Sequence, residues 1–217
     1  MIDAVLFDYD GVLMQSHPYH VQAWRAEFAA SDFDVDVADE DVLLYEGSMA
    51  INIGRRLFLK SGIAITEEEL TAFTQRKQER YRQITRATVM PGVPEFVDFL
   101  SEAGTRIAIV TGTSRLNLEK SLPASLIKKF NGIVTCESVE RAKPHPEPYL
   151  MGAEKLGVPP SKCLVVENAP LGIQAGKAAG MRVAALLTTL ARGHLEGADV
   201  YFKDIVELHA NWRLVTR

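Results

Sequence analysis

Two aspartates, Asp8 and Asp10, stand one residue apart at the end of an apolar run in the stretch LFDYDGVL. If they leave a strand in extended backbone, their side chains share a face, so two carboxylates crowd one small volume. Repulsion between the two carboxylates raises the pKa of one of them unless a cation such as Mg²⁺ is present. With the cation bound, one acid stays ionised as ligand and nucleophile while the other carries a proton. Gly11 suits the sharp turn that follows. An ordinary strand-end turn capped by aspartates is equally compatible with the pair.

A second candidate group, Thr111-Gly112-Thr113, follows another apolar run and precedes helix-like sequence. Backbone N–H groups and a hydroxyl at a helix N-terminus form an anion site, which fits a phosphoryl oxygen. Plain N-capping of the helix by Thr113 or Ser114 is the alternative interpretation.

Two further side chains have the right chemistry for the same site. Lys143 lies in RAKPHP, where the prolines hold the backbone extended and can aim a cation. Glu167, followed by Asn168, ends a third apolar run and is a candidate metal ligand. The alternatives are a solvated lysine and a glutamate that caps the next helix. The glycines of the following GIQAGKAAG predict a helix lying close on a sheet.

The site residues stand at the ends of short apolar runs, each followed by helix-like sequence, and the elements that these runs form must position them. Runs that are apolar on both faces are typical of buried parallel strands, which predicts a doubly wound, Rossmann-like α/β core. Ligands of such sheets lie beyond the carboxyl ends of the strands, where Asp8, Thr111 and Glu167 are expected to converge. The predicted strands are Ala4–Phe7, Ile107–Val110, Ile133–Val134, Leu164–Val166 and Val183–Leu187.

The stretch 15–88 interrupts this alternation, because it contains helical patterns and no convincing strand. Pro91-Gly92-Val93-Pro94 marks the return to the core. The sequence therefore predicts an α/β core made of residues 1–14 and 89–217, with an all-helical insert at 15–88.

Within the insert, Val21, Trp24 and Phe28 form one apolar stripe, and Thr66-Glu67-Glu68-Glu69 resembles a helix-capping sequence. A later group of basic residues lies among glutamates, and we interpret it as a solvated helix face. Lys77 is kept as a possible substrate contact. The basic residues are Arg76, Lys77, Arg80, Arg82 and Arg86.

Composition limits the partners. A net charge of −4 and a pI near 5.8 argue against a nucleic-acid or anionic-membrane surface. No apolar stretch approaches a membrane span, and the first residues lack the basic region of a signal peptide, so we expect a cytoplasmic location. Cys136 and Cys163 lie far apart in apolar runs and are interpreted as core residues. The sequence does not specify an oligomeric state, and a monomer is compatible with it.

The order of the motifs, from the acidic pair through Thr111-Gly112-Thr113 and Lys143-Pro144 to Glu167-Asn168, strongly resembles the haloacid dehalogenase superfamily of aspartyl-phosphate phosphotransferases. The helical insert resembles the cap of the β-phosphoglucomutase-like branch, where a segment like YHVQAW recurs. KPHPEPYL and ENAPLGIQAGKAAG are similar to sequences of small sugar- and polyol-phosphate phosphatases of that branch. The resemblance covers essentially the whole chain.

The resemblance implies that Asp8 is the nucleophile and that Asp10 is the general acid and base. It implies a Mg²⁺ cofactor held by Asp8, the Asp10 carbonyl and Glu167, with Asn168 beside them. Thr111, Gly112 and Thr113 would bind phosphate together with the catalytic Lys143. In the cap, the residues expected to shape the substrate pocket are His20, Trp24, Gly47, Ser48 and Lys77.

Three departures from the family pattern refine the expectation. Asn168 stands where relatives commonly have a second acid, which makes the predicted metal site one negative charge weaker. Gln15 replaces an acid often found after the first motif. The segment from Gly47 to Ala50 lacks the arginine that mutase-like relatives use for a second phosphate.

The missing arginine favours a Mg²⁺-dependent phosphatase acting on a small sugar, polyol or glycolate phosphate. A phosphomutase with a bisphosphate intermediate is the second hypothesis, and a phospho-accepting regulatory pseudoenzyme is the third. The sequence does not identify the substrate.

Overall fold

A six-stranded parallel sheet forms the centre of the computed structural model, which describes residues 2–216. Its strand order is β3-β2-β1-β4-β5-β6. The five predicted strands are present; the sixth, β6, lies at the edge of the sheet with two half-buried residues and was not predicted. The strands are β1 (Ala4–Phe7), β2 (Arg106–Val110), β3 (Gly132–Val134), β4 (Cys163–Glu167), β5 (Arg182–Leu186) and β6 (Val200–Phe202).

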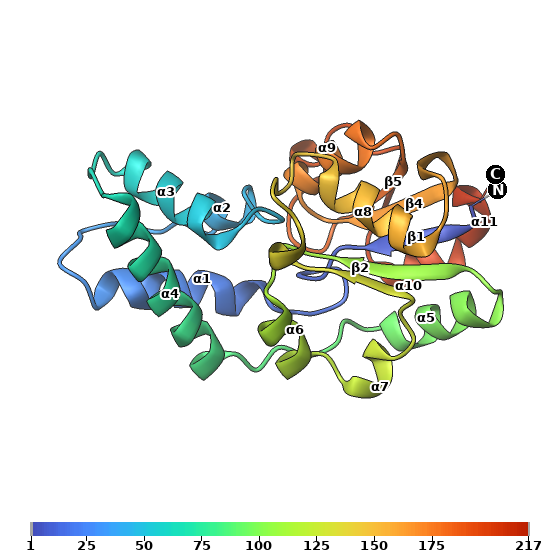
Figure 1. The fold of residues 1–217 in the computed structure, drawn as a ribbon, viewed down its shortest axis with the longest axis horizontal. Coiled ribbons are helices and arrows are strands. Elements are labelled where there is room, and N and C mark those ends of the chain that lie inside the picture. Colours follow the sequence, from blue (N-terminus) through green and yellow to red (C-terminus); the bar gives the residue numbers. More distant parts are fainter. Residues whose placement is uncertain (1, 217) are drawn as a thin grey trace.

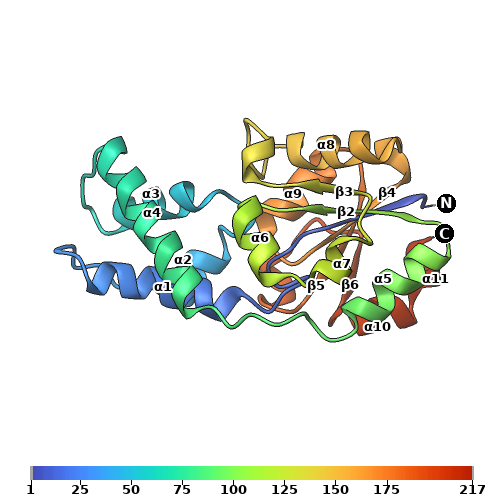
Figure 2. The same ribbon diagram turned by 60° about the horizontal axis from the view of Figure 1, so that its bottom comes forward.

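Helices cover both faces of the sheet, as its fully buried central strands require. The core helices are α5 (Val93–Glu102), α6 (Arg115–Ser121), α7 (Ala124–Ile127), α8 (Glu147–Leu156), α9 (Pro170–Ala178), α10 (Ile205–Ala210) and α11 (Trp212–Val215). One face packs Phe7 and Ile109 against α5, α6 and α10, and the other packs Leu6 and Val165 against α8 and α9 (Figures 1 and 2). The predicted doubly wound fold is confirmed. Short 3₁₀ helices span Cys136–Ser138, Pro160–Lys162 and Arg192–His194.

An all-helical cap lies at one end of this core, at the left of Figure 1. Its own hydrophobic core contains the predicted stripe of Val21, Trp24 and Phe28, joined by Phe58 and Phe73. These aromatic rings lie within contact of one another, so the cap has a separate packed interior. The cap helices are α1 (His17–Ala29), α2 (Asp39–Leu43), α3 (Ala50–Lys60) and α4 (Glu67–Ile84).

Two crossings of the chain connect the cap to the core. They run side by side, because Gln15 N donates to Thr88 O at 2.8 Å and Met14 pairs with Val89. The predicted division of the chain at 14/15 and 88/89 falls at this place. Thr66 and Glu69 form the predicted capping box at the start of α4.

Both cysteines are free thiols; Cys163 is buried, whereas Cys136 is partly exposed. Among the described residues, no helix combines the length and the apolar character needed to cross a membrane.

Candidate active site

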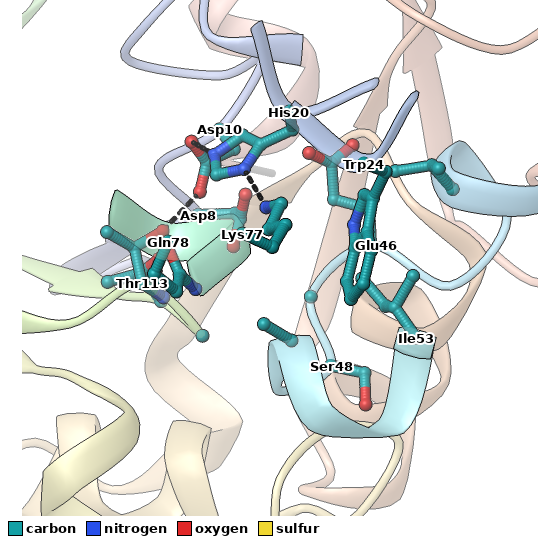
Figure 3. Close-up of a pocket in the computed structure, with 15 residues that line it drawn as sticks. Asp8, Asp10, His20, Trp24, Glu46, Ser48, Ile53, Lys77, Gln78 and Thr113 are labelled. Carbon is teal, nitrogen blue, oxygen red and sulfur yellow. Dashed lines mark hydrogen bonds and ion pairs between the residues drawn. The ribbon is translucent and has the colours of Figure 1, made fainter. Parts of the chain in front are cut away.

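Three neighbouring strands end at one edge of the sheet and present polar side chains there. Asp8 follows β1, Thr111 follows β2, and Glu167 is the last residue of β4. Because β1 pairs with both β2 and β4 in parallel register, these three side chains emerge side by side. Figure 3 shows the pocket between this edge of the sheet and the cap, with Asp8 among the labelled residues.

Lys143 connects two of these acids. Its Nζ lies 2.6 Å from Asp8 Oδ1 and 2.7 Å from Glu167 Oε1, and it also donates to the carbonyl of Val110 at 3.1 Å. The lysine is 3% exposed and lies over the ring of Tyr149. The alternative of a solvated lysine is therefore wrong.

Glu167 is held by hydrogen bonds on both carboxylate oxygens. Oε1 accepts from Lys143 and from the Tyr149 hydroxyl, and Oε2 accepts from the backbone N–H groups of Asn168 and Ala169. The last two bonds order the turn before α9, which begins at Pro170 and has no side-chain cap, so the helix-capping interpretation is wrong. A Cβ atom at Gly172 would lie 1.6 Å from Glu167 Oε1, which explains why α9 needs a glycine where it faces the carboxylate.

Asp10 is surrounded by donors. Ser16 Oγ donates to Oδ1 at 2.5 Å, Thr113 Oγ1 donates to Oδ2 at 2.7 Å, and His20 Nε2 lies 3.3 Å from Oδ1. Burial works against the ionised form, but His20, Ser16 and Thr113 outweigh it and hold the pKa of Asp10 well below its ordinary range.

Asp8 behaves in the opposite way. Burial raises its pKa to about 8; Lys143 lowers it, while Glu167 and Asp10 raise it further. Without a cation, the protein thus favours the protonated form of Asp8 and the ionised form of Asp10, whereas the predicted assignment applies to the site with Mg²⁺ bound. The reason is that Asp10 has several donors, whereas Asp8 shares one lysine with Glu167. A cation beside Asp8 would lower its pKa again.

The oxygen atoms available as metal ligands beside Asp8 fit such a cation. Asn168 Oδ1 is buried and has no hydrogen-bond partner within residues 2–216, while Nδ2 of the same amide donates to Thr189 Oγ1 at 3.0 Å and lies 3.2 Å from His17 Nε2. The two contacts of Nδ2 orient Oδ1, and an orphaned amide oxygen beside acidic groups suits Mg²⁺. No three His, Cys, Asp or Glu side chains of residues 2–216 form a ready ligand cluster. An ion here would rely on amide, backbone and phosphate oxygens as well as on Asp8.

The turn after β2, from Thr111 to Thr113, contacts both Asp10 and the cap. Thr113 N donates to Thr111 Oγ1 at 2.9 Å, and Ser114, not Thr113, caps α6. A Cβ atom at Gly112 would lie 2.9 Å from the carbonyl oxygen of Ser48. The cap loop thus approaches the predicted phosphate-binding turn directly.

The cap side of the pocket contains all five predicted cap residues. The cavity has a volume of about 40 Å³ and is lined from the cap by His20, Trp24, Gly47, Ser48 and Lys77, joined by residues that the sequence analysis did not single out. The additional cap residues are Val42, Glu46, Ala50, Ile53 and Gln78.

Lys77 departs most from expectation. The solvated-face interpretation is wrong for it, because the side chain is 1% exposed, whereas Arg76 and Arg80 of the same helix pair with Glu27. Lys77 Nζ lies 3.0 Å from His20 Nδ1 (Figure 3), and burial lowers the pKa of Lys77 to about 7.

Several residues of the site were missed at the sequence level. Ser16 and His17 follow the acidic pair closely, and Tyr149 lies in the first turn of α8, shortly after Lys143, but no local pattern distinguishes them. Glu46 reaches the site from the loop between α2 and α3, where its Oε2 lies 2.7 Å from His17 Nε2.

Comparison with known proteins agrees with this geometry. A family model described as a haloacid dehalogenase-like hydrolase matches residues 2–180. Hexitol phosphatase A of Escherichia coli is 32% identical over 205 residues, which cover 94% of this chain and 91% of that protein. Protein CbbY of Rhodobacter capsulatus is 30% identical over 216 residues, covering 94% of both chains.

Among solved structures, a Bacteroides vulgatus protein provisionally assigned as a beta-phosphoglucomutase superimposes with a TM-score of 0.86. It is 36% identical in sequence, and the alignment covers 99% of this chain and 88% of that one. The likeness extends over core and cap together.

Proposed function

The chain belongs to the haloacid dehalogenase-like hydrolase family, and from this premise we propose that it is a Mg²⁺-dependent phosphatase that hydrolyses a small phosphorylated metabolite through a phosphoryl group on Asp8. Hydrolysis of phosphoric monoesters is the activity named for relatives of this chain, such as hexitol phosphatase A. The observation that carries the proposal is the contact of Asp8 Oδ1 with Lys143 Nζ at 2.6 Å, where Asp8 faces a pocket that the cap lines.

In the first half of the reaction, an Asp8 oxygen attacks the phosphorus atom while the bond from phosphorus to the ester oxygen breaks. Asp10 gives its proton to the departing oxygen. Asp10 is ionised in the protein alone, but an incoming phosphate dianion raises its pKa, so the acid acquires its proton as substrate binds. Thr113 and Ser16 fix the position of this carboxyl.

In the second half, a water molecule attacks the phosphorus of the aspartyl phosphate, Asp10 removes its proton, and the bond from phosphorus to Asp8 breaks. The products are inorganic phosphate and the free Asp8 carboxylate. Lys143 stabilises the negative charge on the transferring oxygens and is kept in place by Glu167.

Asp8, the Asp10 carbonyl and Asn168 would hold Mg²⁺, and Glu167, predicted as a further ligand, would lie beside them with its oxygens hydrogen-bonded to Lys143, Tyr149 and two backbone N–H groups. When bound, the ion supplies positive charge that neutralises the phosphate and keeps Asp8 ionised.

The phosphatase hypothesis is favoured over the mutase hypothesis by the charge of the cap. A phosphomutase of this type must bind two phosphates, and the cap residues that line the cavity include one lysine, Lys77, and no arginine. The name hexitol phosphatase A for a relative of similar length supports the same choice.

Phosphate release from a panel of small phosphate esters, measured with Mg²⁺ and with EDTA, tests the proposal. We expect turnover of at least one sugar or polyol monophosphate that EDTA abolishes and added Mg²⁺ restores. Turnover that requires a bisphosphate primer would indicate a mutase, and a stable phosphoprotein without turnover would indicate a regulatory module.

A further inference from the structure

Asn168 needs to be held in one orientation, which an acid in the same place would not. The two oxygens of a carboxylate are equivalent, whereas an amide has one oxygen and one NH₂ group, and only the oxygen binds a cation. Asn168 Oδ1 is buried, and no group in the described part of the chain donates to it. The amide therefore serves as a metal ligand only if neighbouring groups keep Oδ1 free and occupy Nδ2.

Two groups lie against Nδ2 of this amide. Thr189 Oγ1 accepts from it at 3.0 Å, but a hydroxyl both donates and accepts, so it fits either orientation of the amide. His17 Nε2 lies 3.2 Å from Nδ2. A ring nitrogen with a free lone pair only accepts, so it pairs with Nδ2 and not with Oδ1. Of the two contacts, the one with His17 selects the orientation that leaves Oδ1 for an ion.

His17 is packed tightly in this position. Its side chain is 6% exposed. A Cβ atom at Gly11 would overlap the imidazole ring and would lie 2.5 Å from Asn168 Nδ2. The ring and the amide are thus pressed together against the turn that follows Asp10, and the contact between them is part of the packed structure.

Glu46 lies against the same ring nitrogen, with Oε2 at 2.7 Å from His17 Nε2. Burial and the nearby Asp10 and Asp8 raise the pKa of Glu46 well above its ordinary range, which favours the neutral carboxyl. A neutral carboxyl has a proton to offer, and an imidazole nitrogen that is approached by donors keeps its lone pair. Glu46 thus supports the form of the imidazole that the amide requires.

These contacts cross from the cap to the core. His17 is the first residue of α1 and Glu46 lies in the loop between α2 and α3, whereas Asn168 follows β4. From this juxtaposition we propose that His17 is a positioning residue, which holds the Asn168 amide in the orientation that binds Mg²⁺ and so makes the affinity for the ion depend on the cap. The inference rests on the metal site of the proposed function and adds a cap residue to it.

A double-mutant cycle tests the inference through the dissociation constant for Mg²⁺, measured by calorimetric titration without substrate. His17→Phe keeps a ring but removes the accepting nitrogen, and it should raise the constant by about tenfold. In Asn168→Asp either oxygen can face the ion, so adding His17→Phe to that variant should change the constant by less than about twofold. His194→Phe is the matched control, because His194 is exposed, and it should leave the constant unchanged.

The two backgrounds separate positioning from a structural defect. A defect in folding, or a change in the charge of the site, would act alike with asparagine and with aspartate at position 168. An effect of His17→Phe that is equal in both backgrounds, or absent in the wild-type background, would overturn the inference. If turnover requires Mg²⁺ in that case, the proposed function stands and the inference alone fails. A wild type that binds no Mg²⁺ would overturn both.

Side-chain NMR in EDTA gives a readout that needs neither metal nor turnover. The two Nδ2 protons of Asn168 are identified as the signals that Asn168→Asp removes. Because the phenyl ring fills the place of the imidazole but accepts no hydrogen bond, these protons should exchange with solvent about tenfold or more faster in His17→Phe than in the wild type. Exchange rates that agree within about twofold would contradict the orienting contact, whether or not any ester is hydrolysed.

Discussion

The Lys143 ammonium lies 2.6 Å from Asp8 Oδ1, although the two residues are 135 positions apart in the chain. The same ammonium lies 2.7 Å from Glu167 Oε1, so one buried cation serves two buried carboxylates. Charges removed from water are tolerated only when they are paired and hydrogen-bonded. The contact therefore stabilises the buried carboxylates in the folded protein and also places the lysine beside the proposed nucleophile.

Replacing Lys143 with methionine leaves Asp8 and Glu167 without their shared cation. The free energy of unfolding at pH 7 in EDTA should fall by about 3 kcal/mol or more, as expected when one partner of a buried ion pair is removed. Lys162→Met is the matched control, because Lys162 pairs with Asp3 at the surface and should cost less than about 1 kcal/mol. Urea unfolding measures both, and equal losses would contradict the account.

Gly172→Ala places a methyl group where Glu167 Oε1 now lies, at 1.6 Å. The carboxylate or helix α9 must move, which should destabilise the protein by about 2 kcal/mol or more. Phosphate release should also fall, since Glu167 holds Lys143. Gly193→Ala is the control, because a Cβ atom there meets nothing within 4 Å. Thermal unfolding that is the same for both variants would refute the close approach of α9.

Lys77 should make stability depend on pH in the alkaline range. Burial lowers the pKa of Lys77 to about 7 from an ordinary value of 10.5, so the unfolded chain binds the extra proton between these values. The contribution of Lys77 to stability therefore rises as the pH rises from 7 towards 10.5, and it is lost as the pH falls.

Lys77→Met removes this titration. Its stability relative to the wild type should accordingly be greater at pH 7 than at pH 9.5, by about 2 to 3 kcal/mol. Other groups titrate in both proteins, so the difference between them isolates Lys77. Urea unfolding at the two pH values measures it, and a difference that does not change with pH would show that the buried amine is not perturbed.

Asn168→Asp tests the expected weakness of the metal site. The new carboxylate adds one negative charge where the orphaned Oδ1 now lies, so the dissociation constant for Mg²⁺ should fall by about tenfold. Calorimetric titration with Mg²⁺ in the absence of substrate gives the constant directly. Unchanged or weaker binding would mean that this amide does not face the ion.

The fold could be predicted from the sequence because its strands are apolar on both faces, which local composition reveals. Ala4–Phe7 and Cys163–Glu167 are buried at every residue and pair in parallel, as runs of this kind predict. Val200–Phe202 was not predicted because it is an edge strand with two half-buried residues and lacks the long apolar run of the central strands. The turn at Gly11, with φ of 77°, followed from the glycine itself.

The site could be predicted only where side chains follow directly from strand ends. Asp8 and Thr111 are of this kind. For Lys77 the resemblance predicted a place in the pocket, whereas the charge pattern of α4 alone indicated a solvated face, because burial of this lysine depends on how the helix packs against α1. Glu46 and His17 meet across the connection between cap and core, and no local signal in the sequence reports such a contact.

The central claim is that Asp8 carries the phosphoryl group. Its most direct test is phosphate release from a sugar or sugar-alcohol monophosphate with Mg²⁺, measured for the wild type and for Asp8→Asn, with far-UV circular dichroism to confirm folding. We predict a loss of about 10³-fold or more in kcat for the variant, because an amide cannot replace the attacking carboxylate. Turnover by Asp8→Asn within about tenfold of the wild type would contradict the mechanism and assign the attack on phosphorus to another group.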